Sequence, residues 1–261
     1  MQNGVMQHEV VGSTMPVLEI HLDPGESVIA VSGELSWMTA SIDMHTATQH
    51  GGAGGLFGAF KRAVSGGSFF MTEYSAIGTA GTVAFAAKIP GHILPVTVAP
   101  GKEYMIHRHG FLCATPDAVL NVGFQQSLGA GIFGGDGFIL QRLSGSAQAW
   151  VELGGEVVSY DLAPGEVLRV HPGHVGMFDA SVNFDIVRIK GIRNMLFGGD
   201  GIFLAQLTGP GKVWLQTLTL SNLAHALMPY LPSAGGERTQ AAGTGALVGS
   251  VIGNLLSGDN R

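Results

Sequence analysis

The chain has 261 residues, of which 46% are hydrophobic and only 12% charged, and its net charge is −6. Its 13 Lys and Arg residues form no basic run, which argues against nucleic-acid binding, and its single cysteine, Cys113, excludes an internal disulfide. Because so few charged side chains would cover the surface of a monomer poorly, we expect a homo-oligomer or contact with a membrane. The alternative is a monomer with a large, well-filled core. The N-terminus lacks a basic segment followed by an apolar run, so we expect a cytoplasmic protein that can lie at a membrane surface.

Short apolar segments alternate with clusters of Gly, Pro, Asp and Asn along most of the chain. This spacing is typical of many short strands joined by turns, so it predicts an all-β sandwich or barrel-like fold. The clearest predicted strands are Val17–Leu22, Ser27–Val31, Thr82–Ala87, Glu103–Ile106, Val119–Phe124, Val157–Leu162, Val167–Val170 and Phe184–Lys190.

The chain also repeats itself. Residues 98–152 align without a gap on 162–216, and a degraded copy lies upstream. Each copy opens with a Pro-Gly pair, at 24–25, 100–101 and 164–165, which predicts a type II turn between two strands. We therefore expect one β domain over residues 1–231, built from a unit used three times. The three copies cover about 16–90, 91–161 and 162–220.

An insertion in the first copy, over residues 51–70, mixes flexible glycines with large apolar side chains and two cations. One interpretation is a membrane-surface or partner-binding loop, and the other is an insertion packed on a neighbouring subunit. Its candidate interaction residues are Leu56, Phe57, Phe60, Lys61 and Arg62.

Histidines provide the main candidate chemistry. The stretch from Gly101 to His109 matches the opening of the cupin motif, and His107 and His109 would face the same side of a strand. The glutamate that the cupin pattern requires is missing, and the next histidines are out of its register. The alternatives are therefore a metal site and hydrogen-bonded, partly buried imidazoles. The four candidate ligands are His107, His109, His171 and His174.

Two glycine-rich loops share the sequence Phe-Gly-Gly-Asp-Gly, at 133–137 and 197–201. A strand rather than a helix follows each loop, so a structural turn is favoured over an anion site. The pair Gly154-Gly155 predicts a hairpin between Trp150–Leu153 and Val157–Leu162. Trp150 itself is expected to pack in the core.

The C-terminal part is predicted to contain a short helix over Ser221–Leu227, with Ser221 as its N-cap. A linker and a Gly-rich apolar tail fill residues 232–261, and the tail is too polar for a membrane span. Small residues recur at every fourth position of the tail, which would let another backbone approach closely if the tail is helical. These residues are Gly245, Gly249 and Gly253.

Several of these motifs, in their order, resemble the bacterial relatives of the altered-inheritance-of-mitochondria (mitochondrial biogenesis) family. The motifs are the Pro-Gly-Glu turns at 24–26 and 164–166, Glu34–Met38, the Gly-rich 51–58, the two Phe-Gly-Gly-Asp-Gly loops and Gly191–Phe197. The resemblance implies a fold akin to the tryptophan RNA-binding attenuator proteins, with pseudo-threefold symmetry, and a homotrimer. It offers no established enzymatic activity, and its mitochondrial relatives are linked to inner-membrane organisation.

The sequence thus favours a non-enzymatic oligomeric scaffold or interaction protein without a cofactor, whose partner is an unidentified protein or lipid. One alternative is a cupin-like metalloenzyme that uses the four histidines. The other is a small-ligand or anion-binding protein whose site is formed by the two glycine-rich loops at 133–137 and 197–201.

Overall fold

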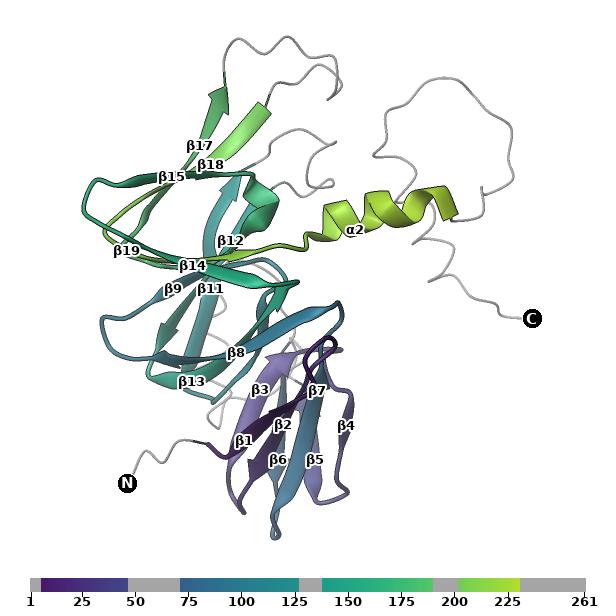
Figure 1. Ribbon diagram of the computed structural model, residues 1–261. Helices are drawn as coiled ribbons and strands as arrows, with labels where there is room; N and C mark the ends of the chain where they lie inside the picture. Colours follow the sequence, from purple (N-terminus) through teal and green to yellow (C-terminus); the bar gives the residue numbers. More distant parts are fainter. Residues whose placement is uncertain (1–5, 47–70, 127–137, 190–201, 231–261) are drawn as a thin grey trace.

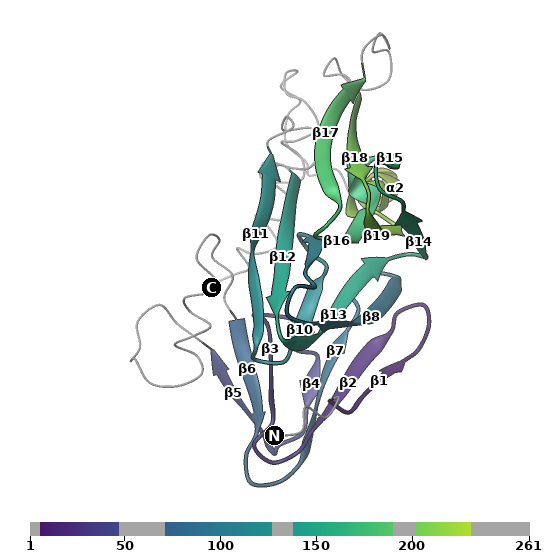
Figure 2. The same ribbon diagram turned by 90° about the vertical axis from the view of Figure 1, so that its left-hand side faces the viewer.

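The computed structural model describes residues 6–46, 71–126, 138–189 and 202–230 (Figures 1 and 2). Strands make up most of these residues, and a single short α-helix follows the last strand, so the all-β prediction is confirmed. The predicted strands Val17–Leu22, Ser27–Val31, Val157–Leu162 and Val167–Val170 have the expected bounds.

Four antiparallel sheets contain the strands. The first sheet has the order β1-β2-β7-β4, and the second has the order β5-β6-β3-β10-β13-β8. Their strands are β1 (His8–Val11), β2 (Val17–Leu22), β3 (Ser27–Val31), β4 (Trp37–Met38), β5 (Ile42–Thr46), β6 (Met71–Ala76), β7 (Gly81–Ala86), β8 (Gly91–Val98), β10 (Phe111–Ala114) and β13 (Ala147–Gly154).

The third sheet has the order β11-β12-β9-β16-β19-β14, and the fourth has the order β15-β18-β17. Their strands are β9 (Tyr104–His107), β11 (Ala118–Gln126), β12 (Phe138–Gly145), β14 (Val157–Leu162), β15 (Val167–Val170), β16 (Val175–Asp179), β17 (Asn183–Ile189), β18 (Ile202–Thr208) and β19 (Gly211–Gln216).

The same pairing scheme recurs in residues 17–86, 91–154 and 157–216, which we call segments 1, 2 and 3. The first strand of each segment pairs with its last: β2 with β7, β8 with β13 and β14 with β19. The third strand of each segment also pairs with the last: β4 with β7, β10 with β13 and β16 with β19. These pairings align the paired strand positions of the three segments with one another.

Two joints connect the segments. Strand β10 of segment 2 pairs with β3 of segment 1, and β16 of segment 3 pairs with β9 of segment 2. Each central sheet is therefore composed of three strands from one segment and three from the next. Apolar side chains fill the space behind each joint, and Trp150, with 0% exposure, lies in the cluster of segment 1 beside Cys113 and Tyr74.

The three Pro-Gly turns have the backbone that the sequence predicts. Gly25, Gly101 and Gly165 have φ of +89°, +81° and +78°, which an L side chain adopts only with strain. The predicted hairpin at Gly154-Gly155 is wrong, because β13 pairs with β8 and β10 whereas β14 pairs with β19. The Gly155 N–H donates to the Pro90 carbonyl instead, as the chain crosses to the next sheet.

The helix α2 (Leu220–Leu227) extends away from the sheets and is followed by the 3-10 turn η2 (Met228–Tyr230) (Figure 1). Its N-cap is Thr219 and not the predicted Ser221, because the helix begins one residue earlier. The Thr219 hydroxyl accepts the N–H of Asn222 at 3.1 Å. Among the described residues, no helix is both long and apolar enough to cross a bilayer.

Candidate functional site

The two histidines of segment 2 are not neighbouring ligands on one strand. His107 is the last residue of β9, whereas His109 lies in the turn that follows, where the Gly110 N–H donates to the His107 carbonyl. The His107 Nε2–H donates to the Glu152 carbonyl at 3.2 Å. Desolvation lowers the pKa of His107 to about 4, so the ring is neutral near pH 7.

The two histidines of segment 3 lie at the 3-10 turn η1 (Pro172–His174): His171 precedes it and His174 is its last residue. Their ring centroids are 5.9 Å apart, and the His174 Nδ1–H donates to the Gln216 carbonyl at 2.8 Å. Burial lowers the pKa of His171. In the described part of the chain, no three His, Cys, Asp or Glu side chains gather in a way that could hold a metal ion. The described geometry therefore lends no support to the cupin-like alternative.

A buried carboxyl group lies next to the first joint. The Glu152 side chain, in a residue with 6% exposure, accepts the N–H of Lys88 at 2.9 Å. Lys88 also forms an ion pair with Glu34, whose side chain is 9% exposed. Burial raises the pKa of Glu152, and it raises the pKa of the Cys113 thiol well above its usual range, so Cys113 is an inert packing residue.

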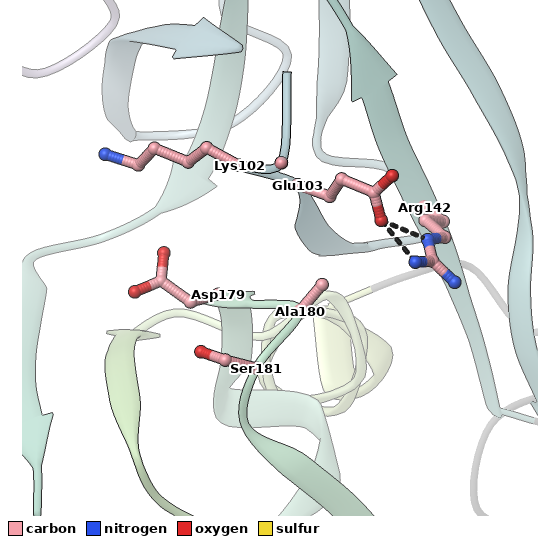
Figure 3. A pocket seen from close by; sticks show the side chains of 7 residues that line it. Lys102, Glu103, Arg142, Asp179, Ala180 and Ser181 are labelled. Atoms are coloured by element: carbon pink, nitrogen blue, oxygen red, sulfur yellow. Dashed lines mark hydrogen bonds and ion pairs between the residues drawn. The ribbon is translucent and has the colours of Figure 1, made fainter. Parts of the chain in front are cut away.

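A polar cavity of about 380 Å³ lies beside the second joint (Figure 3). The turn before β9 contributes Lys102 and Glu103, β12 contributes Arg142, and the end of β16 contributes Asp179. Arg142 forms an ion pair with Glu103, and the Lys102 ammonium lies 5.6 Å from the Tyr104 ring centroid. Two cations and two carboxylates balance, so the cavity has no net charge that would select an ion.

One oxygen in this cavity has no partner. Asp179 Oδ2 accepts the N–H of Lys212 at 2.8 Å, whereas the buried Oδ1 has no hydrogen-bond partner. The counterparts of Asp179 are threonines with one hydroxyl: Thr39 accepts from Thr82 at 3.0 Å, and Thr115 accepts from Gln148 at 3.1 Å. At all three positions the side chain accepts a backbone N–H of the partner strand at the end of a strand pair. This structural role explains Asp179 without a ligand.

Two strands of the described residues lie at sheet edges, although their counterparts have a neighbouring strand on each side. Trp37 of β4, Cys113 of β10 and Met177 of β16 occupy the same position, opposite Ala84, Trp150 and Trp214. Cys113 and Met177 are 0% and 1% exposed because a strand lies on each side of them, but Trp37 is 49% exposed. Among the described strands, β4 has only β7 as a neighbour.

The matching edge is at the other end of the molecule. Strand β15 is the counterpart of β3 and β9, which hold β10 and β16 at the two joints. Within the described ranges β15 pairs with β18 alone, and its Val167 is 48% exposed. Figures 1 and 2 show β4 and β15 far apart in one copy, so neither edge covers the other. Sequence patterns could not reveal these edges, because the strands of every segment look alike.

The other predicted interaction residues lie outside the described residues. These are Leu56, Phe57, Phe60, Lys61, Arg62, Gly245, Gly249 and Gly253, together with the loops at 133–137 and 197–201.

Comparisons with known proteins agree with this architecture. The family described as Mitochondrial biogenesis AIM24 matches residues 8–218. An uncharacterized protein of Streptococcus pyogenes serotype M6 is 27% identical over 223 residues, which cover 84% of this chain and 88% of the relative. A crystal structure of a Streptococcus pyogenes protein from a structural genomics consortium superimposes with a TM-score of 0.68 at 24% identity. It covers 87% of this chain and 100% of its own.

Proposed function

Since the chain belongs to the mitochondrial biogenesis AIM24 family, we propose that it is a non-enzymatic scaffold that assembles from three copies joined head to tail. The observation that carries the proposal is the complementary pair of open edges, β4 at one end of the chain and β15 at the other. Residues 1–231 would form a threefold-repeated fold like that of the tryptophan RNA-binding attenuator proteins, and the recurring pairing scheme supports this assignment.

The two internal joints predict the register of the joint between copies. At the first joint Cys113 pairs with Ala30, and at the second Met177 pairs with Ile106. The corresponding pair between copies is Trp37 with Val170. The next pair at each internal joint gives the same result. These pairs are Ala114 with Ile29 and Phe178 with Met105, and they predict that Met38 lies opposite Arg169 between copies.

Burial supports the assembly energetically. The counterparts of Trp37 are almost fully buried, so pairing would remove most of the exposed surface of Trp37 from water. Apolar burial contributes roughly 25 cal/mol per Å². A joint of this head-to-tail kind closes into a ring when the rotation per copy divides a full turn, and it produces an open filament otherwise.

The mass of the purified chain in solution tests the assembly. We expect light scattering to give three times the chain mass of 27.1 kDa. Trp37→Lys would place a charge in the joint and is expected to yield monomers, whereas the exposed Met44→Lys, on β5 at a different edge, serves as the matched control. A wild-type protein with the mass of a monomer in solution would overturn the proposal of a three-copy scaffold.

A disulfide tests the register separately. With Met38→Cys and Arg169→Cys in one chain, oxidation is expected to link neighbouring copies into covalent trimers, because opposed residues on paired strands fit disulfide geometry. Cys113 is buried and does not compete. Crosslinked monomers would show that each chain closes on itself, and a trimer without crosslinks would reject the register alone.

A further inference from the structure

Strand β14 provides a second open edge, which the ring would leave free. The first strands of the three segments, β2, β8 and β14, are equivalent, and each has its last strand on one side. Their other edges differ. Strand β1 covers β2, with Val10 opposite Leu18 and Glu9 opposite Glu19.

A proline protects the edge of β8. Glu19, Pro95 and Ser159 occupy the same register position, opposite Ala84, Trp150 and Trp214. Proline has no N–H and is found on edge strands, where it prevents another strand from adding. Segment 3 has Ser159 there instead, so β14 has neither a covering strand in the described residues nor a blocking proline.

Every second residue of β14 directs its backbone N–H and C=O away from the sheet, where an added strand could pair with them. Glu156 accepts the N–H of Thr217 through its carbonyl at 3.0 Å, so its backbone points toward β19. Backbone groups alternate sides along an antiparallel strand. Val158 and Tyr160 therefore also face β19, whereas the N–H and C=O of Val157, Ser159 and Asp161 face away from the sheet.

The side chains of the edge define what it would bind. Val158 and Tyr160 are 43% and 44% exposed, which provides an apolar, β-favouring surface at the middle of the strand. Carboxylates lie near both ends: the side chains of Glu156 and Asp161 are 83% and 81% exposed. Their ion pairs, with His92 at 3.1 Å and Lys212 at 3.8 Å, are open to solvent.

From these observations we propose that β14 binds an extended segment of another protein as an added antiparallel strand, with apolar β-branched residues at its centre and basic residues at its ends. The segment would occupy the place on β14 that β1 occupies on β2. A second copy of β14 fits less well, because antiparallel pairing would bring Glu156 of one copy toward the acidic end of the other. This proposal gives the scaffold of the preceding subsection a partner-binding site.

A labelled peptide tests the site on the full-length chain. The probe is fluorescein-Lys-Lys-Val-Thr-Val-Thr-Val-Lys-Lys, and its matched control replaces all four lysines by glutamates. We expect fluorescence anisotropy to show binding of the lysine peptide, and at least roughly tenfold weaker binding of the glutamate peptide at low salt. Hydrogen exchange should slow at Ser159 in the complex and remain unchanged at Tyr160, whose N–H already faces β19.

Two variants decide the result. Ser159→Pro copies the residue of β8 and removes the outward donor, so we expect at least roughly tenfold weaker binding, with Ser159→Thr as the control that keeps the N–H. The double variant Glu156→Lys and Asp161→Lys is expected to prefer the glutamate peptide, and it tests the site even if the proline variant fails to fold.

Three outcomes would overturn the proposal: no binding to the wild type, equal binding to Ser159→Pro when that variant is folded, or binding that requires removal of residues 231–261. The last outcome would mean that the chain's own tail occupies the edge. Light scattering on Ser159→Pro separates this site from the ring, because a variant of β14 should keep the mass of the wild type.

Discussion

Glu152 and Gln216 occupy the same position in segments 2 and 3, and each accepts a backbone N–H through Oε1. The donor is Lys88 at 2.9 Å for Glu152 and Gly154 at 3.0 Å for Gln216. The Gln216 amide also donates to the Gly173 carbonyl at 3.0 Å. A carboxylate cannot make this second bond unless it is protonated.

Replacement of Glu152 by glutamine should therefore stabilise the protein at neutral pH. Burial raises the pKa of Glu152 above its ordinary value of 4.5. Ionisation of Glu152 therefore opposes folding increasingly as the pH rises above 4.5. We expect Glu152→Gln to raise the free energy of unfolding by about 1 kcal/mol at pH 7, the net value of one hydrogen bond. Urea unfolding at pH 7 and pH 4 measures the effect, and a gain that is equally large at pH 4 would contradict the explanation.

His107 should make the protein sensitive to acid. Desolvation lowers its pKa from 6.5 to about 4, so the unfolded chain binds a proton more readily than the folded one. The stabilising contribution is complete above pH 6.5 and is lost as the pH falls toward 4, by about 1 kcal/mol per pH unit. His107→Gln keeps a donor for the Glu152 carbonyl and is expected to flatten thermal stability between these pH values. An unchanged slope would assign the acid sensitivity to other groups.

The two equivalent tryptophans should differ in their contribution to stability. Trp150 is 0% exposed and meets the His8 ring edge-on at 5.2 Å between ring centroids, whereas Trp214 is only partly buried. We expect Trp150→Ala to lower the free energy of unfolding by about 3–5 kcal/mol and Trp214→Ala by clearly less. Denaturant unfolding of both variants checks the order, and equal losses would contradict the burial described here.

Asp179→Thr should be neutral or stabilising. The substitution installs the residue found at both equivalent positions, keeps an acceptor for the Lys212 N–H and removes the buried oxygen without a partner. A buried unsatisfied polar group costs about 1–3 kcal/mol, so a gain of up to that size is expected in thermal unfolding. Thr115→Val is the control and should lose about 1 kcal/mol. A large loss in Asp179→Thr would indicate that Oδ1 holds a ligand in the cavity.

Local patterns predicted the strands well and the connections less well. Alternation of apolar residues placed Val17–Leu22 and Val157–Leu162, and the Pro-Gly pairs predicted turns with positive φ at Gly25, Gly101 and Gly165. The Gly154-Gly155 hairpin was wrong because a turn signal does not say which strand the chain will meet next. The helix cap was misplaced by two residues, since serine is the better capping residue in isolation and the sequence therefore favoured Ser221 over Thr219.

The candidate metal site shows the same limit. Spacing of two residues would place His107 and His109 on one face only if the strand continued, but β9 ends at His107. The sequence itself argued against a metal site, because the glutamate of the cupin motif is missing. In the structure, His107 and His174 form local hydrogen bonds with backbone carbonyls, and the His171 ring packs against that of His174.

The sequence by itself determined the β class, the three Pro-Gly turns and the family, because these depend on side-chain periodicity and on backbone preferences of Pro and Gly that act over a few residues. Only the tertiary structure decided which strands lie inside a sheet and which lie at its edge. That difference arises from long-range pairing: Trp37, Cys113 and Met177 have the same place in their segments, yet a second neighbouring strand buries two of them and leaves the third at an open edge.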